Sequence, residues 1–331
     1  MNHLELILPF SIPPAGLAKD LSREIRTPAL ARLIACASRT KLQVTDDFSH
    51  ALAHEYWLAG DFPPSDTTNS PANTGNIMQL ADLTVNRGHW FTIRPVHIHI
   101  ARDHLVLTDQ RRLNITEADS RVLFDIAQIC CQEVGLTLLY GDAKTWFLRA
   151  DDWTDLRTAT ADAACGHNID IWMPAGKHER DWRKLQNEIQ MMWYTHNINA
   201  EREMRGEKVI NSIWISNGGS YSGCNSKPLY KAANIAQHLG TFPKGEQTIL
   251  ADQLSEAAIN NDWGQWLDEM QRLEDSCFVP LVHAIQTKKI SQLQFICTDA
   301  RTLVQFDLTP WSLRKFWVKA SLNNLFSIAK P

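Results

Sequence analysis

The sequence predicts an α/β fold, in which helices flank a sheet, with a smaller α+β domain inserted into it. Three observations predict it: an apolar run at 4–8 precedes an amphipathic helix pattern from Thr27, alternating strand patterns fill 90–107, and strand and helix patterns resume at Ser212. An α+β segment between two α/β segments indicates an insertion. The predicted domains are an α/β domain at 1–85 and 212–331 and an inserted domain at 86–211.

The first predicted strand ends at Pro9, where the chain enters a loop. Thr27 and Pro28 then predict a helix start, because threonine caps helices and proline suits the first turn. The following apolar residues fall on one face of that helix. A stretch rich in Pro, Ser, Thr and Asn at 62–76 predicts a long surface loop able to carry binding or catalytic groups.

Helix signals are clearest in the predicted inserted domain. Thr116, with Asp119 three residues later, resembles a capping box, and the apolar periodicity continues until Gly135. A second amphipathic helix is predicted from Glu179 to Tyr194. Strands are predicted at 136–140 and 146–148, and a turn at 101–103 between two strands.

The C-terminal third predicts a return to α/β order, with a strand from Ser212, a long helix at 266–281 and a strand at 294–297. The segment 311–319 is basic and aromatic. Such a stripe is used by membrane-surface helices, but a C-terminal helix docked on its own domain is the commoner use and is our prediction.

Composition excludes several classes of protein. The net charge of -4, with 33 basic and 37 acidic residues, argues against a nucleic-acid surface. Apolar runs are too short for a membrane span and no signal peptide is visible, so we expect a cytoplasmic protein without membrane contact. The seven cysteines lack a C-x-x-C pair and read as reduced, buried thiols.

Two short motifs have competing interpretations. His97 and His99 share one strand face at a spacing that a zinc or iron site uses, but no Cys or second acidic pair accompanies them, so a polar strand face is favoured. The segment 217–220, Asn-Gly-Gly-Ser, follows a strand and has the composition of a phosphate cradle. Because it lacks the Lys-Ser/Thr ending of a P-loop, a plain turn is predicted.

Several segments resemble a known family when taken in chain order. His196-Asn197-Ile198-Asn199, then Arg202, Gly206 and the run Asn-Ser-Ile-Trp-Ile at 211–215, resemble the "HPVN…R…G…N-x-IW-x-W-G" stretch of archaeal-type, 2,3-bisphosphoglycerate-independent phosphoglycerate mutases. The segment 165–171 resembles their "CTPPHDI", and 27–33 resembles their "TPNLDRLA". The RpfE-type group of regulatory proteins is still closer, with matches at 88–91, 95–97, 101–109, 140–143 and 165–174.

This resemblance implies an alkaline-phosphatase-like metal domain from the two terminal parts and a substrate domain between them. In active members a pair of divalent metals, Mn or Zn, activates a serine hydroxyl and holds the phosphate that is transferred. The matching nucleophile position falls near Ser70 or Thr74. The resemblance also implies an anion-binding set of His167, Asp170, His196, Asn199 and Arg202.

The family's metal ligands are largely replaced. Where the family has Asp-Gly after the first strand, this chain has Pro9-Phe10-Ser11, which supplies no carboxylate. The family's D-x-x-x-H matches 262–266, where an indole replaces the imidazole, and its late Asp-His pair matches 299–300, where the second residue is alanine. Only Asp262 and Asp299 remain as candidate metal ligands.

Two functions are consistent with this pattern. The first is a non-catalytic regulator or binding protein of the RpfE type, without a cofactor, that binds a small anionic or phosphorylated ligand. The alternative is an active phosphoglycerate mutase or phosphatase with a rearranged Mn or Zn site that includes Asp262 and Asp299. The sequence favours the first and carries no signal for an oligomeric state.

Overall fold

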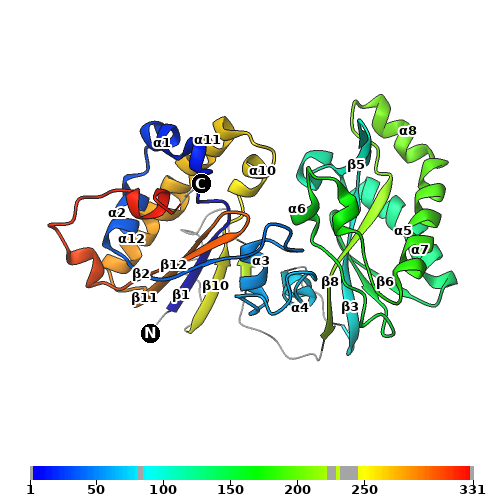
Figure 1. The fold of residues 1–331 in the computed structure, drawn as a ribbon, viewed down its shortest axis with the longest axis horizontal. Coiled ribbons are helices and arrows are strands. Elements are labelled where there is room, and N and C mark those ends of the chain that lie inside the picture. The colour runs from blue at the N-terminus through cyan, green and yellow to red at the C-terminus, as the bar shows by residue number, and fades with distance from the viewer. Residues whose placement is uncertain (1–2, 81–84, 222–228, 232–244, 329–331) are drawn as a thin grey trace. The chain divides into compact units, whose positions relative to one another are not determined.

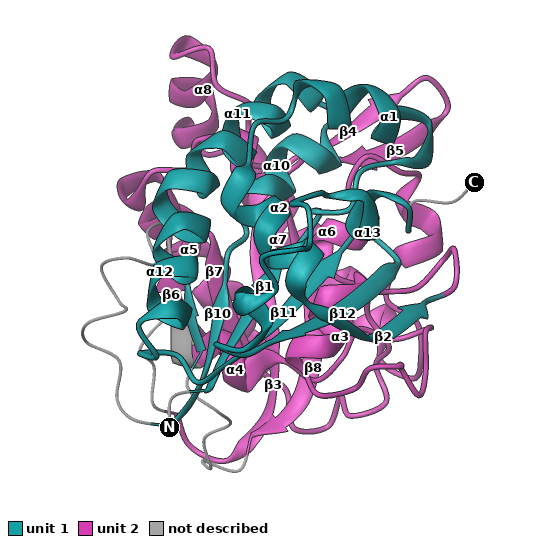
Figure 2. Ribbon diagram, turned by 90° about the vertical axis from the view of Figure 1, so that its left-hand side faces the viewer, with its two compact units in different colours: residues 1–45, 227–331 teal, residues 46–226 magenta. Residues whose placement is uncertain are grey.

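Figure 1 shows the computed structural model, which describes residues 3–80, 85–221, 229–231 and 245–328. Contacts divide the chain into two compact units, coloured separately in Figure 2. Unit 1 comprises Met1–Thr45 and Lys227–Pro331, and unit 2 comprises Asp46–Ser226. The predicted inserted domain, 86–211, lies entirely within unit 2, which also takes in the residues on either side of it.

A mixed six-stranded sheet is the centre of unit 1. Its strands lie in the order β2 (Ser38–Val44), β12 (Thr302–Leu308), β11 (Gln292–Thr298), β1 (His3–Leu8), β10 (Glu246–Leu250) and β9 (Leu229–Lys231). β11, β1, β10 and β9 are parallel to one another, whereas β12 runs antiparallel to both of its neighbours. A largely parallel sheet flanked by helices confirms the predicted α/β class.

The described helices of unit 1 are α1 (Ala15–Glu24), α2 (Pro28–Cys36), α10 (Leu254–Ile259), α11 (Trp263–Leu273), α12 (Val279–Gln286) and α13 (Asn323–Phe326). Helix α2 packs against α12 and against β12 of the sheet (Figure 1). The predicted cap of α2 is wrong, because the Thr27 side chain makes no cap bond. Glu274 replaces it, accepting the backbone N–H of Ala29 at 2.5 Å and of Leu30 at 3.2 Å. A carboxylate here is favoured by the helix dipole.

The long helix predicted at 266–281 is present as α11 and α12 joined by a π-helical segment, Glu274–Phe278. The docked C-terminal helix predicted from the basic and aromatic tail is wrong. That segment forms only a short 3-10 turn at Ser312–Arg314, and the side chains of Trp311, Phe316 and Trp317 are 72%, 85% and 71% exposed. No helix within the described ranges is both long and apolar enough to cross a lipid bilayer.

Unit 2 is built on an antiparallel sheet in the order β6 (Thr137–Asp142), β7 (Thr145–Arg149), β3 (Gly88–Val96) and β8 (Ser212–Tyr221). A two-stranded ribbon, β4 (Ile98–Ala101) and β5 (His104–Leu107), has the predicted turn, with Arg102 at a φ of 61°. The helices of this unit are α3 (Ala53–Leu58), α4 (Thr74–Leu80), α5 (Glu117–Glu133), α6 (Ala161–Ala164), α7 (Glu179–Tyr194) and α8 (Asn197–Met204).

Both faces of this sheet are covered by helices. Successive residues of a strand point to opposite faces, so Phe91 and Trp146 join the main core with α5 and α7. Trp90 and Phe147 point the other way and pack with Met78 of α4. The sheet therefore lies between two apolar layers within unit 2.

The two strongest helix predictions in this unit are confirmed. α7 begins and ends at the predicted residues, and the Thr116 hydroxyl caps α5 by accepting the backbone N–H of Asp119 at 3.0 Å. The turn predicted at 217–220 is wrong, because β8 continues through it to Tyr221. A side chain at position 218 would collide with the ring of Phe91. The close approach of that ring therefore accounts for the glycine, and no phosphate cradle is needed to explain it.

Candidate functional site

The carboxyl end of β1, where the family resemblance places a metal-binding carboxylate, is closed by an aromatic pair. The indole Nε1 of Trp266 donates to the backbone oxygen of Phe10 at 2.9 Å. Trp266 is fully buried and Phe10 is 8% exposed. The Ser11 hydroxyl donates to the oxygen of Leu8 at 2.8 Å. The polar atoms at this strand end are thus held by the protein itself.

Asp262 and Asp299, the two candidate metal ligands, both stabilise local backbone. Asp262 is the N-cap of α11 and accepts the N–H of Gln265 at 3.0 Å. Asp299 accepts the N–H groups of Arg301 and Thr302 at 2.7 and 2.6 Å in the turn between β11 and β12. Over the part of the chain that the structure describes, no three His, Cys, Asp or Glu side chains gather as a metal ion requires. These donors do not fit a two-metal centre.

Ser70 and Thr74, the candidate nucleophiles, are both 2% exposed and have their hydroxyls engaged. Ser70 Oγ lies 2.7 Å from the Thr158 hydroxyl and accepts the backbone N–H of Asn217 at 2.8 Å. Thr74 Oγ1 donates to the backbone oxygen of Asn217. These hydroxyls tie the loop before α4 to β8, an arrangement that stabilises the fold without presenting a nucleophile.

Three of the five candidate anion-binding residues lie at α8. Arg202 is fully buried and Asn199 is 7% exposed. Asn199 donates to the oxygens of Trp193 and Ile210 at 3.2 and 2.9 Å and accepts the N–H of Ile210 at 2.8 Å. His196 caps α8 by accepting the N–H of Ile198 at 3.2 Å. The amide of Asn199 is therefore used within the fold.

Arg202 forms a buried ion pair with Asp119, whose Oδ2 lies 2.6 Å from its Nη1. Its remaining nitrogens donate to the backbone oxygens of Lys208 and Leu113. Arg205 and Glu207 extend the pair into a network. A fully buried guanidinium whose three nitrogens all contact protein acceptors stabilises the fold and presents no exposed donor to a ligand.

His167 and Asp170, the other two candidates, are exposed and lie in a different segment of unit 2. His167 stacks on Trp172 with 5.3 Å between ring centroids. Asn168 caps the 3-10 turn Ile169–Trp172 by accepting the N–H of Asp170 at 3.1 Å. No hydrogen bond or ion pair in the described chain joins these residues to those of α8.

A second group of ionised residues was not predicted, and we call it the arginine–carboxylate cluster: Glu55, Arg94, Asp109, Arg111 and Asp162. Four elements bring it together in unit 2, namely α3, β3, the 3-10 turn Gln110–Leu113 and α6. Arg111 contacts Asp162 at 2.5 Å and Asp109 at 3.0 Å. Glu55 accepts the N–H of Leu52 and the hydroxyl of Thr160.

Two of the three carboxylates of the cluster have pKa values shifted in opposite directions. Burial, followed by the charge of Asp162, raises the pKa of Glu55 to about 7. Burial also acts to raise the pKa of Asp162, but Arg111 and Arg94 outweigh it and hold that pKa well below its ordinary value. Opposite charges nearby favour the ionised form, and a like charge disfavours it. Near neutral pH, Glu55 is thus the member of the cluster that changes charge.

Arg94 is the least satisfied cation of the cluster. Its Nη1 lies 3.7 Å from Asp162, a longer contact than either of those made by Arg111. Its Nε is buried and has no hydrogen-bond partner among the described residues. The side chain as a whole is 25% exposed. Because a guanidinium has five donors and binds oxyanions with two at once, Arg94 is the group best placed to bind an added anion.

Only part of this cluster has a recognisable signal in the sequence. Asp109 stands at the end of the 101–109 match and Arg111 follows it. Glu55 and Asp162 are 107 positions apart and neither belongs to a recognisable motif. Glu55 is tied to the start of α6 by the hydroxyl of Thr160, the N-cap of that helix, and no local sequence pattern encodes this contact.

Comparisons with known proteins show the fold and no family. No family model matches the chain, and neither does any curated protein. Among solved structures, the PH0037 protein from Pyrococcus horikoshii is similar, with a TM-score of 0.54 and 10% identity over 93% of this chain and 87% of that one. At that identity the likeness concerns the fold alone. A cofactor-independent phosphoglycerate mutase from Thermoplasma acidophilum gives a TM-score of 0.43 with 10% identity, over 99% of this chain and 95% of that one.

The buried position of Arg202 makes its removal costly for the fold. Arg202→Met leaves Asp119 with only the more exposed Arg205, so we expect a loss on the order of 3 kcal/mol in the free energy of unfolding. Urea unfolding followed by circular dichroism measures it. Arg205→Met is the matched control and should cost less, since that side chain is 42% exposed. An unchanged unfolding midpoint for Arg202→Met would contradict the structural role.

Glu55 makes stability depend on pH. Its pKa is raised in the folded state, so its contribution is fully present below its ordinary value near 4.5 and is lost as the pH rises through about 7. Glu55→Gln keeps the acceptor oxygen and should stabilise the protein at about pH 8 by on the order of 2 kcal/mol, with the difference vanishing near pH 5. Thermal unfolding across that range tests this, with Glu201→Gln on exposed α8 as the control. A pH-independent difference would refute the assignment.

Proposed function

We propose that this chain is a phosphoglycerate-mutase-like protein without metal-dependent phosphoryl transfer, acting as a regulator or binding protein of the RpfE type for a small anionic ligand. The hydrogen bond from the Trp266 indole to the Phe10 oxygen carries the first part of the proposal. A buried indole stands where the resembled enzymes have an imidazole ligand. Because its N–H is a donor only, it offers a metal no lone pair.

The candidate ligands support the same conclusion. Asp262 and Asp299 already accept backbone N–H groups at the start of a helix and in a hairpin turn. A metal ion would compete with those bonds, and among the described residues no group of three His, Cys, Asp or Glu side chains gathers to hold it. Phosphoryl transfer through paired metals needs several anionic and imidazole ligands converging on one point.

Arg94 carries the second part of the proposal, the anionic ligand. Its Nε has no hydrogen-bond partner among the described residues, its Nη1 makes only a 3.7 Å contact, and its side chain is 25% exposed, so this guanidinium keeps unused donors. Asp162 fixes the position of the side chain from one side. A phosphate or carboxylate approaching from solvent would gain charge-assisted hydrogen bonds there. Protonation of Glu55 removes a nearby negative charge and so favours the anion below about pH 7.

The absence of metal chemistry is tested on the purified protein after incubation with Mn²⁺ or Zn²⁺ and removal of free ions. We expect metal well below one equivalent, and no hydrolysis or isomerisation of 3-phosphoglycerate with either ion. Asp262→Asn and Asp299→Asn should then change only thermal stability, by about 1 kcal/mol for the helix cap. Stoichiometric metal that either variant abolishes, or metal-dependent turnover, would overturn this part of the proposal.

Anion binding is tested by titrating inorganic phosphate and 3-phosphoglycerate by calorimetry. Loss of a charge-assisted contact in Arg94→Met should weaken the binding by about tenfold or more. Arg121→Met, which removes an exposed arginine of α5, is the matched control and should have no effect. Sulfate keeps its charge between about pH 8 and 6, so its binding should tighten over that fall in pH as Glu55 takes up a proton. Binding that is insensitive to Arg94→Met would show that the anion site lies elsewhere.

A further inference from the structure

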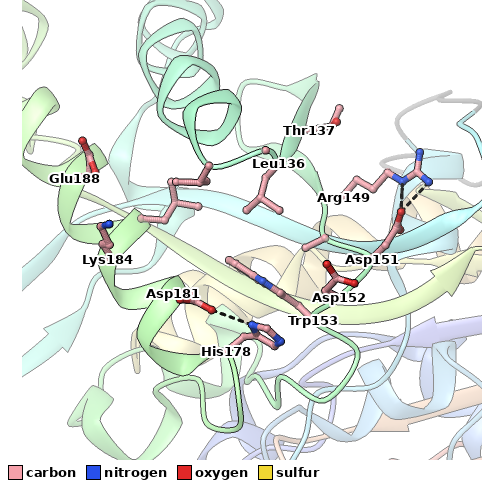
Figure 3. A pocket seen from close by; sticks show the side chains of 14 residues that line it. Leu136, Thr137, Arg149, Asp151, Asp152, Trp153, His178, Asp181, Lys184 and Glu188 are labelled. Atoms are coloured by element: carbon pink, nitrogen blue, oxygen red, sulfur yellow. Dashed lines mark hydrogen bonds and ion pairs between the residues drawn. The ribbon is translucent and has the colours of Figure 1, made fainter.

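A pocket of about 570 Å³ opens in unit 2, away from the groups discussed so far. Figure 3 shows its lining, with Trp153 near the centre of the view. The lining comes from the end of α5 and the start of β6, from the turn after β7, and from α7 with the residue before it. Pockets of this size hold small organic ligands. We call it the Trp153 pocket.

The aromatic wall of the pocket has an unused donor. Trp153 stacks on His178 with 6.1 Å between ring centroids and 19° between ring planes. The indole is 7% exposed, yet within the described chain its Nε1 donates to no acceptor. His178 Nδ1 lies 2.9 Å from Asp181, and its Nε2 is buried without a partner among the residues described. When Nδ1 donates to that carboxylate, Nε2 is left as an acceptor.

The charged side chains of the pocket fall into two classes. Arg149 pairs with Asp151 at 2.8 Å, and Asp181 is engaged by His178 (Figure 3). The other three are Asp152, Lys184 and Glu188, which form no hydrogen bond or ion pair with any described residue. The pocket therefore presents unused donors and unused acceptors together.

The balance of charge decides which ligand chemistry fits. Four carboxylates face two basic side chains and one imidazole, so the pocket is acidic and disfavours an anion. A purely cationic ligand would satisfy the carboxylates but has no oxygen to accept from Trp153. A hydroxyl group both donates and accepts. A small molecule with several hydroxyl groups therefore matches the unused donors and acceptors of the pocket and brings no charge into it.

We propose that the Trp153 pocket binds a neutral polyhydroxylated ligand of monosaccharide to disaccharide size. The hydroxyls of the ligand accept from the Trp153 N–H and from Lys184, and they donate to the carboxylates of Asp152 and Glu188. One further hydroxyl of the ligand donates a hydrogen bond to Nε2 of His178. This site is separate from the proposed anion site at Arg94, with which it shares no lining residue.

The experiment titrates glucose, maltose, trehalose and myo-inositol into the full-length protein, with binding detected by calorimetry and by saturation-transfer NMR. At least one of these should bind, and its affinity should be nearly independent of salt because the ligand is neutral. Spermidine and 3-phosphoglycerate are the cationic and anionic comparison probes. Binding of spermidine at this pocket in preference to all four sugars, or no sugar binding at millimolar concentration, would overturn the proposal.

Two variants locate the binding. Trp153→Phe keeps an aromatic ring and removes the N–H, and we expect about five- to tenfold weaker sugar binding. Glu188→Gln leaves an exposed position on α7 folded and should weaken binding by about threefold. Trp311→Phe, the same change at an exposed tryptophan of unit 1, is the control and should leave the affinity unchanged. Sugar binding that both pocket variants leave intact would also refute the proposal.

Discussion

The hydrogen bond between the Trp266 indole and the Phe10 oxygen is the constraint on which the interpretation of unit 1 depends. Phe10 has a φ of 56°, in the left-handed region that non-glycine residues adopt at a cost of about 1–2 kcal/mol. Burial of both aromatic rings and the bond from the indole offset that cost. The strand end is therefore built around a hydrogen bond from a buried indole to the backbone. A cluster of carboxylates in the same place would require this backbone and its packing to change together.

Unit 2 contains ion pairs whose side chains are buried or largely buried. Arg202 with Asp119, and Arg111 with Asp162, are ion pairs at positions where an unpaired charge would be expensive. These two arginines are satisfied by their partners, and Arg94 is not. Burial alone thus does not identify a binding residue. The number of donors left after the protein's own contacts separates an arginine that supports the fold from one available to a ligand.

The elements that depend on local pattern were predictable from the sequence. The apolar stripe of α7 and the Thr116 cap of α5 specify those helices without knowledge of the rest of the chain. Contacts between distant segments were not predictable. The cap of α2 comes from Glu274, some 245 positions away, and Ser70 meets Asn217 across 147. The family resemblance predicted Asn199 and Arg202 as anion-binding residues, and the packing shows that their polar atoms make hydrogen bonds and an ion pair within the fold.

The sheet of unit 2 has apolar layers on both faces, and this affects how its strands find their alignment. In a sheet with one exposed face, shifting the register of a strand by one residue would turn its apolar side chains toward water. The loss of their burial makes the wrong register much less stable. Here a slip of β3 by one residue would exchange Trp90 and Phe91 between two buried layers. Both side chains would stay buried, so the hydrophobic effect distinguishes the correct register from the slipped one only weakly. The pairing of β3 with β8 has an irregularity between Trp90 and Thr92, with glycines opposite it. This bulge can form in one register only, so it specifies the alignment of the two strands. Correct pairing of β3 with β8 then depends on shape at this bulge more than on the hydrophobic pattern along the strands.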